Sequence, residues 1–348
     1  MLFILTMKFS RAVSIACGIC TVSALPSSKA KSSFNWRDTK YLLAFGDSYT
    51  YVQGTYGHQN YSFIGDLQDF SYTPEELMSN KIIQNQLGTS AGGPNWVEYL
   101  TSCFSGLPSN CAKQLWDFAF AGSDVSTTYT ALHHNYTVSL ENQIKQWSTY
   151  AQPVIPMDPS KTLVAIWIGI NDIGDTDSYK FPSYNSTSFA SLYTNIIRTE
   201  FAAIETIYKA GFRNYLFMKL PPLQRTPPNL IRAAGPLPNA TMLNQYNSIL
   251  ASTAANFEST HPGTKAMVFD TFSYLSSVLD DPAPYGIKNV TNYCPRYDAP
   301  DIATNYAAYG CIPIPQYFWY NTGHITYHTH EILAQEVGKF LDSQSSKH

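Results

Sequence analysis

Short runs of apolar, β-branched and aromatic residues recur along the chain, and turn-forming residues bound each of them. Runs of this kind are typical of strands that are buried on both faces of a parallel sheet. The runs cover residues 41–45, 116–120, 162–168, 214–218 and 266–270. We therefore predict five buried strands at these positions.

Between these runs, apolar residues recur with the period of a helix. The helical segments cover residues 96–103, 188–210, 241–259 and about 326–343. Because strands alternate with helices, the pattern predicts an α/β fold, a doubly wound, mainly parallel five-stranded sheet with helices on both faces. The other long stretches are predicted to be irregular and to form the walls of a binding site; they cover residues 49–94, 123–160, 220–240 and 271–323.

The N-terminal segment has the pattern of a secretory signal. Lys8 and Arg11 precede an apolar stretch at residues 12–25, and the small residues Ala24 and Ala30 are candidate cleavage sites. The apolar stretch is shorter than the roughly 20 residues that a membrane-spanning helix needs. We expect residues 1–30 to be removed as a signal peptide and the protein to be secreted into the extracellular space, with no membrane span.

Composition narrows the class of protein further. The net charge is −3 and the sequence contains no cluster of basic residues that could bind the phosphates of a nucleic acid. We therefore expect no nucleic-acid partner. No repeat, charge run or low-complexity linker divides the chain, so we predict one domain over residues 31–348 and a monomeric protein.

Cysteine usage agrees with export. Cys103, Cys111, Cys294 and Cys311 remain after the predicted signal peptide, an even number that favours disulfides in an oxidising compartment. Three pairings are possible, and the short intervals favour Cys103 with Cys111 and Cys294 with Cys311. A zinc site is the alternative, but the spacing lacks paired Cys-x-x-Cys motifs.

Glycosylation sequons are frequent, as is typical of a secreted glycoprotein that carries N-linked glycans. They stand at Asn60, Asn135, Asn185, Asn239 and Asn289.

Three of the predicted strands end in polar or glycine-rich clusters. Gly46-Asp47-Ser48 follows the first strand, residues 121–124 the second, and residues 169–172 the third. Ligands of a doubly wound sheet bind beyond the carboxyl ends of its strands, where such clusters meet. A serine on a rigid strand end is placed like a hydrolytic nucleophile, and His324 near the C-terminus supplies a candidate base.

Acyl transfer also needs donors for the oxyanion that develops on the substrate. The candidates are the backbone N–H groups of Ser48 and Gly122 and the side-chain amide of Asn171. Glycine allows a close approach, and an Asn amide donates without carrying charge. Each of these two residues also has a structural alternative, because Gly122 fits a turn and Asn171 fits a helix cap.

Taken together, the motifs resemble the SGNH or GDSL hydrolases, which are named for a Ser, Gly, Asn and His in four sequence blocks. Ser48 stands in GDS, Gly122 in FAFAGSD, Asn171 in GIND, and His324 in the last block. The resemblance implies a three-layer α/β/α, flavodoxin-like fold and an acyl-Ser48 intermediate. It implies neither a metal nor an organic cofactor.

Within this superfamily, the chain more specifically resembles the fungal secreted acetylesterases of carbohydrate esterase family 16. The segments TSAGGPNWVEYL at 89–100 and LHHNYT at 132–137 carry it. It implies an esterase that removes acetyl groups from acetylated oligosaccharides of plant cell walls. The alternatives are a lipase or phospholipase for longer acyl chains and a non-catalytic carbohydrate-binding protein that has kept the fold.

The last block departs from the family pattern. An aspartate usually stands three residues before the histidine, but this chain has Asn321 there. An Asn side chain can accept the imidazole N–H but brings no negative charge. Either Ser48 and His324 act as a dyad, or another acceptor such as Asp298 or Asp301 orients the histidine. His324 and His328 also have the spacing of two zinc ligands on a helix, but Ile325 replaces the glutamate of that motif.

Overall fold

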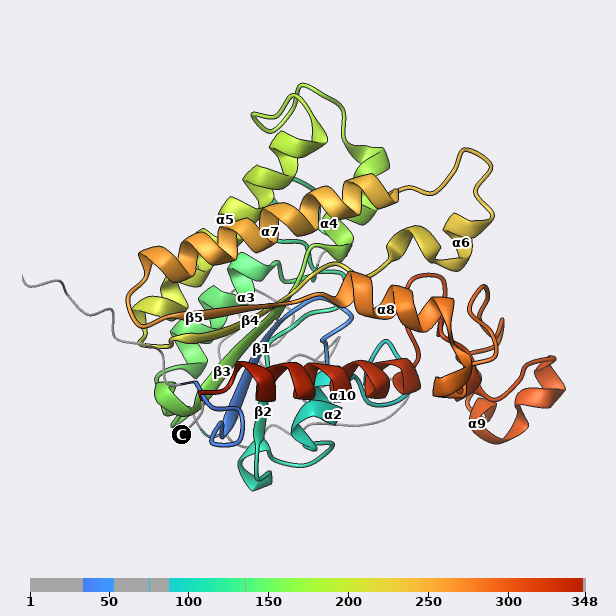
Figure 1. Cartoon of the computed structure of the whole chain (residues 1–348), viewed down its shortest axis with the longest axis horizontal. Helices are drawn as coiled ribbons and strands as arrows, with labels where there is room; N and C mark the ends of the chain where they lie inside the picture. The colour runs from blue at the N-terminus through green and yellow to red at the C-terminus, as the bar shows by residue number, and fades with distance from the viewer. Residues whose placement is uncertain (1–33, 53–74, 76–87, 135, 347–348) are drawn as a thin grey trace, which may run out of the picture.

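A computed structural model describes residues 34–52, 75, 88–134 and 136–346 (Figure 1). The predicted signal peptide at residues 1–30 lies outside the described residues, and so do the sequons at Asn60 and Asn135.

A five-stranded parallel sheet forms the centre of the molecule, as the apolar runs predict (Figure 1). The strand order is β2-β1-β3-β4-β5, which is the flavodoxin-like order of a doubly wound sheet. The strands are β1 (Tyr41–Gly46), β2 (Gln114–Asp117), β3 (Thr162–Trp167), β4 (Asn214–Met218) and β5 (Lys265–Phe269). Strand β2 starts and ends earlier than the predicted run at 116–120, and the other strands agree closely.

Helices cover both faces of this sheet and complete a three-layer α/β/α sandwich (Figure 1). One layer consists of α3 (Leu140–Gln146), α5 (Phe189–Lys209) and α7 (Ala240–Thr260), in which α5 contacts both of the others. On the other side of the sheet, α2 (Trp96–Thr101) and α8 (Thr271–Asp280) contact α10 (Tyr327–Gln344). The predicted helices are confirmed as α2, α5, α7 and α10.

Four of the described α-helices lie where the sequence pattern predicted irregular chain, and the two longer ones are α3 and α8. Helix α3, with a π-helical turn at Trp147–Ala151, lies within residues 123–160, and α8 lies within residues 271–323. The prediction was wrong at both places, because tertiary packing of a few apolar side chains stabilises these short helices more than their polar sequence suggests. The remaining short helices are α4 (Ile170–Gly174), α6 (Pro227–Leu230) and α9 (Ile302–Asn305).

The central strands β1 and β3 give the loops of the site fixed starting points. Every residue of β1 and β3 is buried, because helices cover both faces. Leu42, Leu43, Ala44 and Phe45 have no exposed surface at all. The loops that leave the carboxyl ends of these two strands therefore start from fixed points.

A second, smaller hydrophobic cluster supports the chain before α10. It contains Ile302, Tyr317 and Tyr320 and is closed by the disulfide Cys294–Cys311. This cluster fixes the segment that leads into residues 321–324. The disulfide Cys103–Cys111 closes the loop after α2, so both predicted pairings are confirmed. Among the described helices, none is both long enough and apolar enough to cross a membrane.

Candidate active site

Ser48 stands directly beyond the carboxyl end of β1, where the chain must pass close to β3. A Cβ atom on Gly46 would lie 2.3 Å from the carbonyl oxygen of Trp167, so only glycine fits there. The fully buried Asp47 accepts a hydrogen bond from the backbone N–H of Tyr49 at 2.9 Å. Burial raises the pKa of Asp47 to about 7. Asp47 therefore shapes the turn that presents Ser48.

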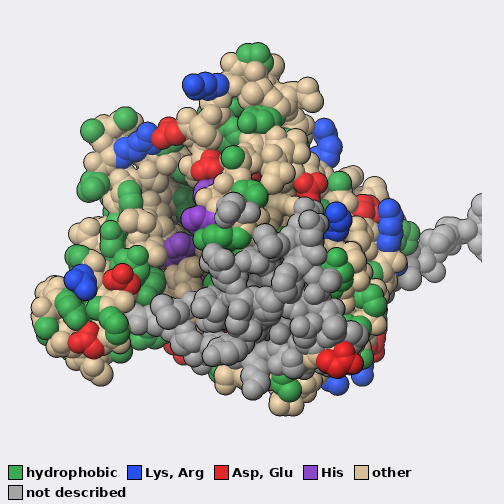
Figure 2. Space-filling view, turned by 180° about the vertical axis from the view of Figure 1, so that it is seen from behind, with side chains coloured by type: hydrophobic (Ala, Val, Ile, Leu, Met, Phe, Trp, Pro, Cys, Tyr) green, Lys and Arg blue, Asp and Glu red, His purple; other side chains and the backbone are tan. Residues whose placement is uncertain are grey.

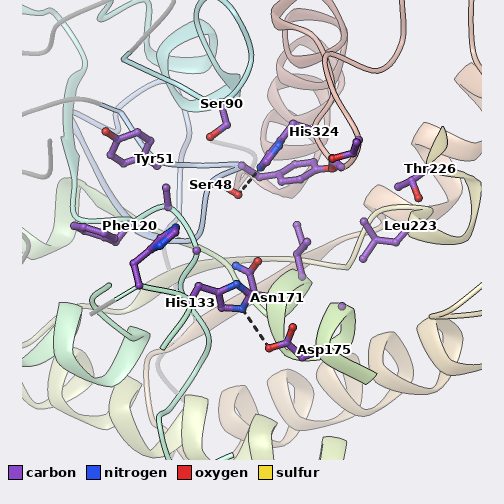
Figure 3. Close-up of a pocket in the computed structure, with 18 of the residues that line it drawn as sticks. Ser48, Tyr51, Ser90, Phe120, His133, Asn171, Asp175, Leu223, Thr226 and His324 are labelled. Atoms are coloured by element: carbon purple, nitrogen blue, oxygen red, sulfur yellow. Dashed lines mark hydrogen bonds and ion pairs between the residues drawn. The ribbon is translucent and has the colours of Figure 1, made fainter. Parts of the chain in front are cut away.

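The predicted serine and histidine meet, although 276 residues separate them in the sequence (Figure 3). The distance from Ser48 Oγ to His324 Nε2 is 2.7 Å, and the distance from His324 Nδ1 to Asn321 Oδ1 is 2.9 Å. The loop that carries Asn321 and His324 thus closes over the end of β1. Asn321 is the residue that orients His324.

The bonds of Asn321 determine which tautomer of His324 is present. The backbone N–H groups of Gly323 and His324 also donate to Asn321 Oδ1, at 3.0 and 2.9 Å. An atom that accepts from two backbone N–H groups is the amide oxygen, so His324 Nδ1 must carry the proton. Nε2 is then free to accept a proton from Ser48. Asp301, considered above as an alternative acceptor, instead binds the hydroxyl of Tyr309 at 2.7 Å.

Packing against Tyr49 completes the surroundings of His324. The ring centroids of Tyr49 and His324 are 5.4 Å apart, and the Tyr49 hydroxyl donates to the carbonyl of Gly323 at 2.5 Å. Burial lowers the pKa of His324 to about 4, and no carboxylate among the described residues faces the imidazole to offset this shift. The imidazole is therefore neutral, and able to act as a base, over most of the pH range.

The two other predicted donors lie on the neighbouring loops of the same cleft. Gly122 has a φ of +80°, a conformation that favours glycine. The side chain of Asn171, at the start of α4, donates to the carbonyl of Ser123 at 2.8 Å. This bond uses one of the two amide hydrogens and leaves the other for a ligand. The backbone N–H of Val125 donates to Asp172 Oδ1 and Oδ2 at 3.2 and 3.1 Å and ties the two loops together.

These residues line one open cleft of about 590 Å³. Ser48, Gly122, Asn171 and His324 all face it, so the structure brings together the four residues that the sequence blocks predict (Figure 3). Figure 2 shows histidine side chains gathered in a hollow of the molecular surface. The remaining walls include Tyr51, Phe120, His134, Tyr136, Leu223, Thr226 and Leu237. Several of them come from the stretches 123–160 and 220–240, which were predicted to form walls.

His133 lies in the stretch 123–160, which was predicted to be irregular. The carboxylates that face it were not predicted from the sequence. His133 Nε2 lies 3.2 Å from Asp175 Oδ2 and 3.6 Å from Asp124 Oδ2. The bond to Asp175 raises the pKa of His133, while burial and the carboxylates around Asp124 raise the pKa of Asp124 to about 9. Asp124 and Asp175 follow different strands, so no local motif in the sequence could have paired them.

The histidines of α10 do not form the metal site considered above. The N–H of His328 Nε2 donates to the carbonyl of Tyr285 at 2.8 Å, away from the cleft. His330 is buried and packs against the ring of Tyr49, with ring centroids 6.0 Å apart. Of the sequons within the described residues, Asn185 and Asn239 are exposed and Asn289 is partly exposed. Glycosylation at these sites stays a prediction.

A serine, a neutral imidazole and amide donors at the carboxyl edge of a doubly wound sheet are the arrangement of serine-type hydrolases. The chain belongs to the GDSL-like lipase/acylhydrolase family, whose profile matches residues 42–337. It is accordingly a carboxylic ester hydrolase.

Comparison with curated proteins gives more detailed likenesses. An acetylesterase of Thermothelomyces thermophilus is 27% identical over 308 residues, which cover 86% of this chain and 87% of the relative. An acetylesterase of Hypocrea jecorina is 23% identical over 342 residues and covers 89% and 90% of the two chains. Among solved structures, an acetylxylan esterase from Geobacillus stearothermophilus is 14% identical with a TM-score of 0.42, over 90% of this chain and 96% of that chain.

Proposed function

We propose that this protein is a secreted serine esterase that removes acetyl groups from the hydroxyls of carbohydrates, with oligosaccharides of plant cell walls as substrates. The observation that carries the proposal is the relay from Ser48 Oγ through His324 to Asn321, with distances of 2.7 and 2.9 Å. The relay opens onto the same cleft as Gly122 and Asn171.

The first half of the reaction acylates the enzyme. Ser48 Oγ attacks the ester carbonyl while His324 Nε2 takes the hydroxyl proton. The negative charge that develops on the carbonyl oxygen is stabilised by the N–H groups of Ser48 and Gly122 and by the amide of Asn171. The C–O bond to the sugar then breaks, and the imidazolium gives its proton to the leaving sugar oxygen.

The second half regenerates the enzyme. Water attacks the acetyl-Ser48 ester and gives one proton to His324 Nε2, the tetrahedral intermediate collapses, and Ser48 Oγ leaves with that proton. Acetate is released. Asn321 holds the imidazole by a neutral hydrogen bond in both halves, and it supplies no negative charge to the imidazolium that forms in each half.

Two observations support a short acyl group on a sugar. The two curated fungal relatives described above are both acetylesterases, and they match over most of this chain. In the cleft, the rings of His134 and Tyr136 stack with centroids 5.0 Å apart, which makes a flat surface of the kind that sugar rings pack against. Secretion is supported by the N-terminal sequence pattern and by the two disulfides.

The decisive test removes the nucleophile. Ser48→Ala should lower the release of acetate from acetylated xylo-oligosaccharides by about 10⁴-fold or more, while the circular dichroism spectrum stays unchanged. Ser259→Ala, at an exposed site in the last turn of α7, is the matched control and should keep full activity. Acetate release by Ser48→Ala at the wild-type rate would refute the proposed role of Ser48.

Substrate class is tested separately. Wild-type protein should hydrolyse p-nitrophenyl acetate faster than the octanoate and longer esters. A preference for long chains would identify a lipase instead and would leave the serine mechanism intact. Failure of a fluorophosphonate probe to label Ser48 would point to a carbohydrate-binding protein without catalysis.

A further inference from the structure

The wall of the cleft beside Gly122 carries a group of metal-ligating side chains that the proposed ester hydrolysis does not use. His133, Asp124 and Asp175 each offer one ligand atom, and these atoms lie within 4.8 Å of one another. They come from two separate loops, one after β2 and one after α4. Figure 3 shows His133 and Asp175 facing each other below Asn171.

Two of the distances between these atoms are also compatible with a shared cation. A charge-assisted hydrogen bond between nitrogen and oxygen is about 2.7–2.9 Å long. His133 Nε2 lies 3.2 Å from Asp175 Oδ2 and 3.6 Å from Asp124 Oδ2. Two tetrahedral zinc ligands at ordinary bond lengths are about 3.4 Å apart, which lies between the two observed distances.

Asp124 gives a second, independent indication of a ligand. Its side chain is only 4% exposed, and its Oδ1 atom is buried with no hydrogen-bond partner among the described residues. Buried carboxylates normally have all their oxygen atoms satisfied by hydrogen bonds, by a partner of opposite charge or by a metal. A cation bound between Asp124 and His133 would compensate the charge of this buried carboxylate.

The charge around the cluster also favours a cation. Asp47, Asp172 and Asp175 all lie near enough to act on Asp124 electrostatically. His133 can supply at most one positive charge to the carboxyl groups of Asp124 and Asp175, which face it. Asp172 is occupied by the N–H of Val125, which leaves Asp124 and Asp175 as the carboxylates that face the imidazole.

We propose that His133, Asp124 and Asp175 form a binding site for a divalent cation of the zinc class. One imidazole nitrogen and two carboxylate oxygens form a ligand set that suits first-row transition metals. The side chains of His133 and Asp175 are 32% and 28% exposed, so the remaining coordination position faces the cleft. The cation would link the loop that carries Gly122 to the end of the helix that carries Asn171.

Zinc binding to the purified protein, measured without substrate, tests this proposal. Protein stripped with a chelator and dialysed is titrated with ZnCl₂ by calorimetry, and one equivalent should bind. His133→Ala and Asp175→Asn, both at partly exposed positions, should each weaken that binding by at least 10-fold. His134→Ala removes the adjacent exposed histidine of the same loop and should bind zinc like the wild type.

Three results would overturn the proposal. The first is the absence of saturable zinc binding below about 1 mM, and the second is an equal zinc affinity of wild type and His133→Ala. The third is a preference for Ca²⁺ over Zn²⁺, because such a preference is typical of sites built from oxygen ligands without an imidazole. Circular dichroism confirms that each variant is folded. Ser48→Ala protein should bind zinc like the wild type, so the outcome is independent of the proposed esterase activity.

Discussion

At the scale of single residues, the most informative side chain is Asn321. It occupies the place of an aspartate and makes the same hydrogen bond to His324, with a length of 2.9 Å. The amide lacks the negative charge that would stabilise the imidazolium. Burial lowers the pKa of His324 to about 4, and the amide adds no charge that would raise it again. A neutral orienting residue therefore favours activity in acidic solution.

Asn321→Asp should move the acid limb of the kcat/KM profile to higher pH. A carboxylate in contact with the imidazole stabilises its charged form and raises its pKa by about 1–3 units. Because only neutral His324 can accept the Ser48 proton, the variant should lose activity relative to wild type between about pH 4 and pH 6. The measurement is the pH dependence of acetate release.

The control for this prediction is Asn321→Ala, which removes the hydrogen bond without adding charge. It should lower kcat at every pH, because the imidazole is no longer held in one orientation. An acid limb that stays in place in Asn321→Asp would show that the charge at residue 321 does not govern the titration of His324.

At the scale of elements, the N-terminus of α2 holds the chain that follows the nucleophile. Asn95 caps the helix by accepting from the N–H of Val97, and Glu98 completes the capping box. The Asn95 amide also donates to the carbonyls of Thr50 and Tyr51, at 2.7 and 3.0 Å. One buried side chain thus connects a helix cap to the turn after Ser48.

Asn95→Ala should lower the free energy of unfolding by about 2–4 kcal/mol. Loss of the cap accounts for about 1 kcal/mol, and the buried carbonyls left without a donor account for the rest. Denaturation by urea measures the change. Asn95→Asp keeps an acceptor for the cap but loses the amide donors, so it should also destabilise the protein. Full stability in Asn95→Asp would show that the bonds to Thr50 and Tyr51 contribute nothing.

At the scale of the whole molecule, buried acids make stability depend on pH. Burial raises the pKa of Glu98 and of Glu200 to about 8. The folded protein keeps these protons at pH values at which the unfolded chain has lost them. Their contribution to stability is fully present below about pH 4.5 and is lost as the pH rises towards 8.

Between pH 6.5 and 8 the protein should therefore become less stable as the pH rises. His324 and His330, whose pKa values are lowered to about 4 and 3, oppose this trend near pH 6.5, where the unfolded chain still binds part of their protons, and add little above about pH 7.5. Glu200→Gln should reduce the slope of unfolding free energy against pH by up to about 1.4 kcal/mol per pH unit. Urea unfolding at several pH values measures it, and an unchanged slope would contradict a protonated Glu200.

Much of this architecture could be predicted from local sequence. The strands β1, β3, β4 and β5 were predictable because a strand buried on both faces needs an uninterrupted apolar run. Helix α8 was missed, although Asp270 caps it and Leu275, Val278 and Leu279 mark its buried face. Its signal is short and lies beside a long polar stretch, so the periodicity was weak.

The sequence by itself predicted the fold class, favoured the observed disulfide pairs and marked Ser48, Gly122, Asn171 and His324 as candidates for the site. These follow from chemistry that is encoded locally, as apolar periods, cysteine intervals and polar clusters at strand ends. Only the tertiary structure decided that Asn321 orients His324, and that Asp124 and Asp175 converge on His133. Such contacts depend on where separate loops meet above the sheet, which the packing of the whole chain sets.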